Sequence, residues 1–292
     1  MQASSTTGDQ GVAPRTLYIV GTPIGNLEDI TFRALRVLKN ATLIACEDTR
    51  HTQKLLNHFL VSKKLVSYHE HNEAARAEEI VAELEKGASV ALVSDAGMPG
   101  ISDPGYRVVS LAVERGIPVV PVPGPAAFVA ALAASGLPTD SFLFSGFLPA
   151  KHGQRVSALE AIRDSETTTT FYEAPHRIVE SMEDVVAVLG SERPVVVARE
   201  VTKLHEEFLR GTAAQVLEQL RARGEVKGEI TLIIGKRTGE QAAPETARVT
   251  IRQRVREVMA ANGIPEMDAL KRVAKERGIS KSEAYREWQR SK

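Results

Sequence analysis

The sequence predicts an α/β protein with two α/β domains and a small all-helical module at its C-terminal end. Short apolar runs alternate with segments of helical periodicity over residues 16–236, which is the order of strands and helices in α/β folds. Loops rich in glycine and proline follow several of these runs. After Gly235 the composition becomes polar and then basic, with further helical stripes.

Length and composition predict more than one hydrophobic core. The chain has 292 residues, 43% of them hydrophobic, and chains of this size usually divide into domains. A stretch bearing glycine and proline at 137–140 suggests a boundary near residue 135. Five segments are expected: a disordered leader (1–15), an N-terminal α/β domain (16–135), a second α/β domain (136–236), a linker (237–247) and a basic helical module (248–292).

Cysteine content and hydropathy predict a cytoplasmic protein. Cys46 is the only cysteine, so no internal disulfide can form, and we expect it to be a small apolar strand residue. The first residues lack the charged start and apolar run of a signal peptide. No later apolar run reaches the length of a membrane span, so no membrane partner is expected.

The strands are expected where apolar runs are short and bounded by turn residues. In the N-terminal domain they are 17–20, 42–46, 65–67, 89–93 and 119–122. In the second domain they are 142–145, 168–172, 194–198 and 229–234, with helices at 178–189 and 213–220. The first helix has an apolar face from Ile30 to Leu38. Asn26 or Asp29 is available to cap it.

The C-terminal module is expected to contain three helices. Two have apolar stripes, and Ser280 with Glu283 forms a capping box for the third. The stripe residues are Ile251, Val255, Val258 and Met259 for the first helix, and Met267, Leu270, Val273 and Ala274 for the second. Ala274 and Gly278 loosely resemble a helix-turn-helix, so the module is either a nucleic-acid contact or a simple helical cap.

Charge is unevenly distributed along the chain. The net charge is zero, yet residues 248–292 hold 12 Lys and Arg against 6 Asp and Glu, leaving 25 against 31 before them. A basic appendage on an acidic body is typical of proteins with a polyanionic partner, although a solvated helix face has the same composition.

The segment most clearly built for a ligand is SDAGMPGISDPG, residues 94–105. Its glycines and prolines can neither extend the preceding strand nor start a helix, so an irregular loop is expected where ligands bind in α/β proteins. The loop contains no Lys or Arg, and Asp95 and Asp103 would repel phosphate. A ligand with hydroxyls and a positive centre, such as an adenosyl sulfonium, suits it; a tight double turn with Asp caps is the alternative.

Two further loops end apolar runs with small or conformationally restricted residues. They are GTPIGN at 21–26 and PGPAA at 123–127, and neither has the spacing of a P-loop or a Rossmann fingerprint. Such loops bring backbone rather than side chains to a ligand. Together with the 94–105 loop they are hard to explain as ordinary turns.

Four polar segments also follow apolar runs: CEDTR (46–50), SYHEHNE (67–73), FYEAPHR (171–177) and AREVTKLHEE (198–207). They would bring His, Glu, Asp, Arg and Lys side chains to one rim, or each is simply a solvated loop. The two histidines of HEH, His69 and His71, lie two residues apart, on opposite sides of a strand, so a metal site is not expected.

Seven motifs occur in order along the chain: GTPIGNLEDIT, CEDTR, YHEHNE, SDAGMPGISDPG, PVPGPAA, FYEAPHR and KGEITLIIG. Together they resemble the 16S rRNA cytidine-2′-O-methyltransferases over residues 16–236, a branch of the tetrapyrrole-methylase superfamily of class III methyltransferases. The resemblance implies two α/β domains with S-adenosylmethionine in the cleft between them, and a homodimer. It also implies methylation of the ribose of a cytidine in the decoding region of 16S rRNA, free or within the small ribosomal subunit.

The resemblance also implies a set of cofactor contacts. The superfamily's first loop falls on Gly21–Asn26, with Ile24 and Asn26 where the superfamily has proline and aspartate. Its Gly-Asp-Pro falls on residues 94–96, which keeps the aspartate. The implied contacts are Gly21, Pro23, Ile24, Gly25, Asp95, Gly97, Met98, Ala126, Ala127, Tyr172 and Glu173, and no metal is expected.

A ribose hydroxyl is a poor nucleophile, so a general base is expected. The candidates are Asp48, His69, His71 and Lys203, the last only if its pKa is depressed. Arg50, Arg177 and Arg199 would hold RNA phosphates, and His176 or Tyr172 could stack on a base.

Two other functions stay open. A tetrapyrrole or diphthine methyltransferase would use the same cleft for another acceptor, although the polar rim suits a polyanion better. A helix-turn-helix regulator with a small-molecule sensing domain would bind duplex DNA through its tail and transfer no methyl group.

Overall fold

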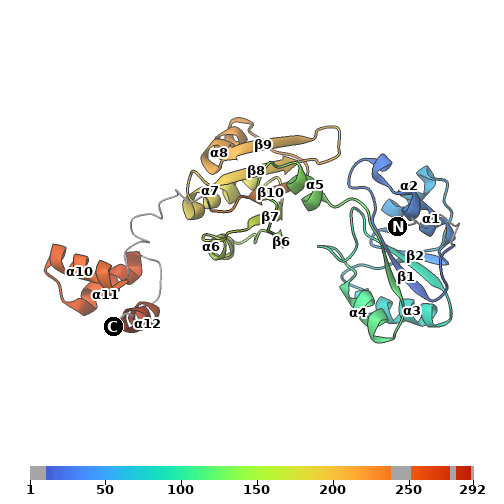
Figure 1. The fold of residues 1–292 in the computed structure, drawn as a ribbon, viewed down its shortest axis with the longest axis horizontal. Helices are drawn as coiled ribbons and strands as arrows, with labels where there is room; N and C mark the ends of the chain where they lie inside the picture. Colours follow the sequence, from blue (N-terminus) through green and yellow to red (C-terminus); the bar gives the residue numbers. More distant parts are fainter. Residues whose placement is uncertain (1–10, 238–250, 277–280, 291–292) are drawn as a thin grey trace, which may run out of the picture. The chain divides into compact units, whose positions relative to one another are not determined.

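The computed structural model describes residues 11–237, 251–276 and 281–290 (Figure 1). The chain forms two compact units, a body (Met1–Arg237) and a tail (Thr238–Lys292), each described by itself below. None of the described helices is long and apolar enough to cross a membrane.

The first lobe of the body is built on a five-stranded parallel sheet with strand order β3-β2-β4-β1-β5. Its strands are β1 (Thr16–Val20), β2 (Leu43–Cys46), β3 (Leu65–Ser67), β4 (Ser89–Val93) and β5 (Val119–Val122). Its helices are η1 (Leu27–Asp29), α1 (Phe32–Asn40), α2 (Thr49–His58), α3 (Glu73–Glu85) and α4 (Tyr106–Glu114). All five expected strands are present.

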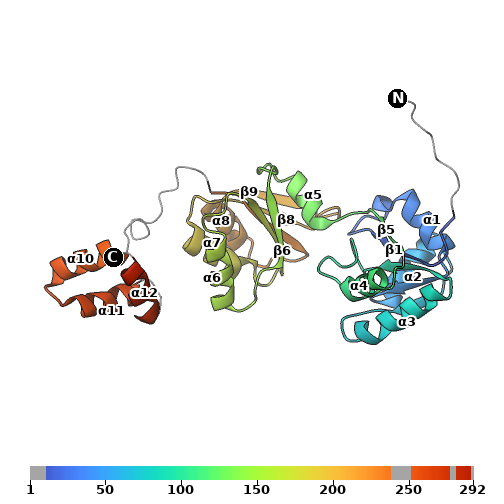
Figure 2. The ribbon, with the colours of Figure 1, turned by 60° about the horizontal axis from the view of Figure 1, so that its bottom comes forward.

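Helices cover both faces of this sheet, which explains its nearly continuous apolar runs. Leu17 and Ile19 of β1 pack in the cluster formed with α3 and α4, whereas Tyr18 and Val20 pack in the cluster formed with α1 and α2. Figures 1 and 2 show the two helix pairs on opposite sides of the strands. Cys46 is buried in β2, as expected of a small apolar strand residue.

The start of the first helix differs from the expectation. Asn26 caps η1, its side chain accepting from the Glu28 N–H, and Thr31 caps α1 by accepting from Ala34. Neither Asn26 nor Asp29 caps α1, because the chain makes a separate turn of 3₁₀ helix first.

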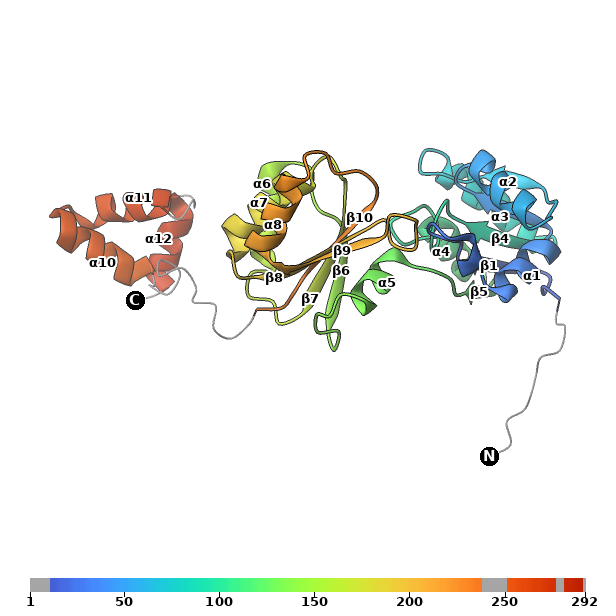
Figure 3. The ribbon, with the colours of Figure 1, turned by 90° about the horizontal axis from the view of Figure 1, so that it is seen from above.

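The second lobe has a mixed five-stranded sheet with order β6-β7-β10-β8-β9, in which only the β6–β7 pair is parallel (Figure 3). Its strands are β6 (Phe142–Phe147), β7 (Thr168–Glu173), β8 (Pro194–Arg199), β9 (Glu207–Thr212) and β10 (Ile230–Ile234). Its helices are α5 (Ala127–Ala133), α6 (His152–Ala161), α7 (Ile178–Leu189) and α8 (Ala213–Ala222). Strand β9 was not expected, because this edge strand buries only Leu209 and carries no apolar run.

The domain boundary lies earlier than the expected residue 135. Residues of α6, α7 and α8 form the core on one face of the second sheet, and α5 packs on the other face through Ala131 and Leu132. Helix α5 therefore belongs to the second lobe, and the crossover precedes Ala127. Ile24 of the first lobe joins the α5 cluster, which ties the lobes together.

Part of the expected leader, at residues 12 and 13, packs on the body. The Ala13 N–H donates to the Tyr18 hydroxyl at 2.7 Å, and Val12 packs against the first core. Residues 1–10 lie outside the described part, as does most of the expected linker at 238–247. Arg237 still belongs to the body, since its N–H donates to the Ser165 carbonyl.

The tail contains α10 (Ile251–Asn262), α11 (Glu266–Glu276) and α12 (Lys281–Arg290) around a core of its own. The expected stripes supply most of that core: Val255, Val258, Leu270, Val273 and Ala274, joined by Ala269, Ala284 and Trp288. Met267 is 52% exposed and lies outside it, contrary to the expectation. Ser280, half of the expected capping box, and Gly278 lie outside the described residues, as does the side chain of Ile251.

Two glycines bring the loops after β1 and β5 into backbone contact. A Cβ added at Gly124 would lie 2.8 Å from the Cα of Gly21, and one at Gly21 would lie 2.7 Å from the Cα of Gly124. No side chain fits between the backbones of these two loops, so both positions require glycine.

Replacing Gly124 by alanine should therefore lower the free energy of unfolding by about 1–3 kcal/mol, because the backbones must separate. Urea denaturation of the two proteins measures the difference. Gly153→Ala is the matched control: it lies in α6 with open space around it, and it should be neutral or stabilising. Equal stability of Gly124→Ala and wild type would contradict the close contact.

Candidate functional site

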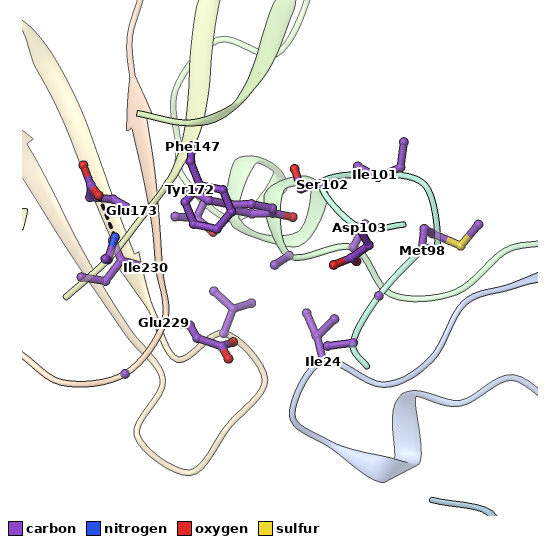
Figure 4. A pocket seen from close by; sticks show the side chains of 18 of the residues that line it. Ile24, Met98, Ile101, Ser102, Asp103, Phe147, Tyr172, Glu173, Glu229 and Ile230 are labelled. Atoms are coloured by element: carbon purple, nitrogen blue, oxygen red, sulfur yellow. Dashed lines mark hydrogen bonds between the residues drawn. The ribbon is translucent and has the colours of Figure 1, made fainter. Parts of the chain in front are cut away.

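A pocket of about 290 Å³ lies between the C-terminal loops of the parallel sheet and the second sheet (Figure 4). From the first lobe come Ile24, Ala96, Gly97, Met98, Ile101, Ser102 and Asp103. From the second lobe and the segment leading into it come Ala126, Ala127, Phe147, Tyr172, Glu173, Ala174, Pro175, Val201, Gly228, Glu229, Ile230 and Thr231.

Three loops form the first-lobe side because their strands are neighbours, in the order β4-β1-β5. The backbones of Thr22 and Gly97 pair through two hydrogen bonds of 2.9 and 3.1 Å, and the Thr22 hydroxyl donates to the Ser94 carbonyl at 3.2 Å. The loop then turns sharply at Ser102, whose φ is 61°. Backbone pairing therefore fixes the loop that carries Met98 and Asp103.

Aromatic side chains form part of the opposite side. Tyr172 at the end of β7 packs edge-to-face on Phe144 and Phe147, with ring centroids 5.0 and 5.6 Å away, and Phe144 stacks on Phe128 of α5. Burial raises the pKa of Tyr172, and a hydrogen bond with the backbone of Phe128 opposes this only in part. Tyr172 is therefore a fixed, neutral wall of the pocket.

Seven of the eleven implied cofactor contacts line this pocket: Ile24, Gly97, Met98, Ala126, Ala127, Tyr172 and Glu173. Gly21, Pro23, Gly25 and Asp95 do not. Gly21 packs on Gly124, and an added Cβ at Gly25 would meet Lys203. The Asp95 carboxylate instead accepts from the Asp48 N–H at 3.1 Å, which fastens the loop after β2 to the loop after β4.

The Glu173 carboxylate is committed to holding the start of α7. Its side chain is fully buried, and it accepts from the Ala174 N–H at 2.7 Å, from the Ser181 hydroxyl at 2.6 Å and from Arg177. These donors occupy both oxygens of the Glu173 carboxylate. Glu173 thus contributes a wall of the pocket rather than a free acceptor, and the Arg177 side chain, 18% exposed, is paired with it.

Asp48, His69 and His71 follow β2 and β3, the other half of the parallel sheet, and none of them lines the pocket. Arg50 holds the pKa of Asp48 well below its usual range by hydrogen bonding to the carboxylate. Asn72 accepts from the His69 N–H at 2.9 Å, and its amide nitrogen lies 3.1 Å from His69 Nε2. Nε2 therefore accepts from Asn72, so its lone pair is already engaged.

His69 and His71 do not lie on a strand, contrary to the expectation, because β3 ends at Ser67. Both residues lie in a turn after β3, and their rings are 6.0 Å apart. Within the described part of the chain, no group of three or more His, Cys, Asp or Glu residues is arranged to hold a metal ion.

Lys203 does not have the depressed pKa that a general base requires. Burial alone lowers its pKa, but ion pairs with Glu200 at 2.9 Å and Glu229 at 3.1 Å outweigh burial and raise it. Lys203 lies in the loop after β8, where Glu200 and Thr202 have left-handed φ angles of 52° and 69°. Its side chain packs against the loop that contains Gly25.

The expected RNA contacts differ in their availability. Arg50 is 88% exposed with its guanidinium on Asp48, and His176 is exposed next to the pocket wall at Pro175. Arg199 pairs with Glu207 and donates to the Lys227 carbonyl at 3.2 Å, so binding a phosphate would require a change of partners.

Sequence reasoning did not assign two carboxylates of the pocket, Asp103 and Glu229. The pKa of Asp103 is raised to about 6, first by burial and then by the negative charge of Glu47; the Ser94 hydroxyl opposes this and Asp95 adds to it. The pKa of Glu47 is itself raised by burial and by Asp95. In the sequence, only the position of Asp103 in the 94–105 loop points to a role in the pocket, and an aspartate that caps a turn would have the same position.

The side chains that line the pocket fit a ligand with a positive centre, hydroxyl groups and a flat apolar part. No Lys, Arg or His is among the lining residues, whereas Asp103 and Glu229 face the cavity. Gly97 and Gly228 expose backbone, and Ile24, Met98 and Val201 provide apolar surface. A phosphate would find no cation among these lining residues.

A parallel sheet whose C-terminal loops meet a mixed sheet across a pocket is a two-lobed α/β architecture. The chain belongs to the tetrapyrrole (corrin/porphyrin) methylases, whose family model matches residues 16–217. It is 49% identical over 272 residues to a protein of Halalkalibacterium halodurans named ribosomal RNA small subunit methyltransferase I, covering 92% of this chain and 93% of that one.

Solved structures share the fold. Uroporphyrin-III C-methyltransferase of Thermus thermophilus superimposes with a TM-score of 0.54 at 25% identity, over 78% of this chain and 95% of that chain. Another structure of this enzyme from the same organism, complexed with S-adenyl homocysteine, has a TM-score of 0.53 at 21% identity, over 75% and 97%.

Asparagine at Asp103 should change the pH dependence of stability. Because the folded-state pKa is raised from 3.8 to about 6, wild type should lose stability relative to Asp103→Asn as the pH rises through this interval. Urea unfolding at intervals between pH 4 and 8 measures the difference. Asp140→Asn, which removes an exposed carboxylate paired with Lys236, is the control. Parallel pH profiles for wild type and Asp103→Asn would show that the pKa is not raised.

Proposed function

We propose that the protein transfers the methyl group of S-adenosylmethionine to the ribose 2′-hydroxyl of a cytidine in the decoding region of 16S rRNA. The observation that carries the proposal is the near full-length similarity to a protein named for rRNA methylation. Of the motifs that resemble the rRNA methyltransferases, FYEAPHR lines the pocket, whereas CEDTR and YHEHNE follow β2 and β3 at the same edge of the parallel sheet. Such a substrate implies a cytoplasmic protein.

S-adenosylmethionine is the donor that the pocket chemistry supports. Its sulfonium supplies an activated methyl group when bound. Glu229 can accept from its hydroxyl or amino groups, and Asp103 can stabilise its positive charge. The apolar side chains of Ile24, Met98 and Val201 offer a surface for the adenine. A protein of the same fold is complexed with S-adenyl homocysteine, the demethylated form of this donor.

Placement of the acceptor is the main task of the protein residues, because in-line methyl transfer from a sulfonium needs little more than alignment. Loop backbones held by the Thr22–Gly97 pairing keep Met98 and Asp103 on one side, and the Tyr172 ring lies opposite. A pocket held from two lobes can exclude water when a nucleotide covers its mouth.

Basic residues outside the pocket are proposed to hold the RNA. Arg50 and His176 are exposed, and Arg177 and Arg199 could exchange carboxylate partners for phosphates. In the tail, Arg256, Lys271 and Lys275 are exposed on the outside of a separate helical core. Phosphate contacts of this kind position an RNA without reading its sequence. The acceptor is either free 16S rRNA or the small ribosomal subunit.

The protein is also proposed to form a homodimer through β6. This strand lies at an open edge of the second sheet, and successive side chains on both of its faces are exposed: Phe142 and Leu143 at 47% each, and Phe147 at 58%. Exposed apolar edge strands are usually covered by another element or chain. A second copy would also shield Phe147 at the rim of the pocket.

Lysine at Leu143 should weaken this dimer, because a charged side chain would be buried at the interface. Sedimentation velocity should show a shift toward monomer. Val113→Lys, on the exposed surface of α4, should leave the association state unchanged. Identical sedimentation of wild type and Leu143→Lys would place any interface elsewhere.

Labelled S-adenosylmethionine offered with small ribosomal subunits, naked 16S rRNA or tetrapyrrole precursors tests the function. We expect label in the RNA of one of the first two samples, resistant to alkaline cleavage at one cytidine, because a 2′-O-methyl group blocks attack by the neighbouring oxygen. Label in the tetrapyrrole sample alone would assign the same fold to another acceptor. Duplex binding by the tail with no methyl transfer would favour a regulator.

A further inference from the structure

The Asp103 carboxylate lines the pocket without an ion-pair partner among the described residues. It lies on the 94–105 loop, directly after the left-handed turn at Ser102, and lines the cavity beside Met98. Figure 4 shows it across the cavity from Tyr172 and Glu229. Within the described residues it takes part in no ion pair, unlike the other pocket carboxylates, Glu173 and Glu229.

Its surroundings are acidic or neutral on each packed element. Glu47 follows β2 and Asp95 follows β4, and both add negative potential at Asp103; Ser94 supplies a hydroxyl; Tyr172 of β7 lies opposite. Burial raises the pKa of Asp103 most, the charges of Glu47 and Asp95 raise it further, and the Ser94 hydroxyl opposes them, which together gives a pKa of about 6. A carboxylate with such a pKa is ionised at neutral pH yet accepts a proton more readily than an ordinary one.

Each of the bases suggested by the sequence is less suitable. The Asp48 carboxylate is taken up by Arg50, the Nε2 of His69 accepts from Asn72, and Lys203 is a stabilised cation. His71 is exposed and lies in the same turn as His69. None of the four lines the pocket.

We propose that Asp103 is the general base of the methyl transfer, an inference that rests on the proposed function. The ribose 2′-oxygen forms a bond to the methyl carbon, and the carbon–sulfur bond breaks with its electron pair staying on sulfur, which becomes a neutral thioether. The hydroxyl proton passes to the Asp103 carboxylate and then to solvent. Glu47 and Asp95 act as positioning residues, since their charge keeps Asp103 basic.

Single-turnover methylation by Asp103→Asn tests the proton transfer. The amide cannot accept the proton, so the rate at neutral pH should fall about 10²- to 10⁴-fold. The wild-type rate should rise with pH through a limb below pH 6, because the bound sulfonium lowers the Asp103 pKa from its value of about 6, and this limb should be absent from the variant. Asp140→Asn should keep the wild-type rate and limb, and a retained limb in Asp103→Asn would overturn the assignment.

Cofactor binding supplies a readout that does not depend on turnover. Near pH 6, where Asp103 is partly protonated, the sulfonium of S-adenosylmethionine should displace its proton, whereas neutral S-adenosylhomocysteine should not. Calorimetry in buffers of different ionisation enthalpy counts the protons released. Asp103→Asn should release fewer protons than wild type with S-adenosylmethionine while binding S-adenosylhomocysteine with similar affinity.

The two readouts separate the proposals. If wild type methylates no RNA, the proposed function fails, and calorimetry still decides whether Asp103 faces the sulfonium. If wild type methylates RNA but Asp103→Asn loses S-adenosylhomocysteine affinity together with its rate, Asp103 is a binding residue and the base assignment is overturned. Equal proton release by wild type and variant would overturn it as well.

Discussion

The backbone contact between Gly21 and Gly124 is the constraint on which the rest of the site depends. It is possible only because neither residue has a side chain, and it fixes the loops after β1 and β5 against each other. The adjacent Thr22–Gly97 pairing adds the loop after β4. Three loops on neighbouring strands thus form one rigid unit without using any side chain that could contact a ligand. Met98 and Asp103 are displayed from that unit.

The strand order divides the C-terminal edge of the parallel sheet into two chemically different halves. Loops on β4, β1 and β5 form the pocket, whereas the polar loops lie on β3 and β2. The halves are joined where Asp95 accepts from the Asp48 N–H. The polar half therefore acts on the pocket through its charge, since Glu47 raises the pKa of Asp103 without lining the cavity.

Sequence patterns predicted the elements whose signal is local. The strands of the covered parallel sheet have continuous apolar runs, and all were found, whereas β9 buries one residue and was missed. Helix α5 was assigned to the wrong lobe, because its partners Val196 and Ile233 are distant in sequence. Residue type at the strand ends predicts candidate bases, but strand order decides which strand ends lie close together. For Asp103 the deciding neighbour, Glu47, is equally remote in the chain.

Two carboxylates of the pocket, Glu173 and Asp103, differ in the partners around them, and this difference separates a structural role from a chemical one. Glu173 receives three kinds of donor, and removing its carboxylate would leave the partly buried Arg177 guanidinium without this partner, so Glu173 serves stability. Asp103 has carboxylates for neighbours, and every charged group that acts on it makes ionisation harder. Such an arrangement lowers stability, and arrangements of this kind cluster at functional sites. A bound cation would relieve that cost. Binding of the sulfonium donor and ionisation of the Asp103 carboxylate are therefore coupled, because the same negative charge takes part in both.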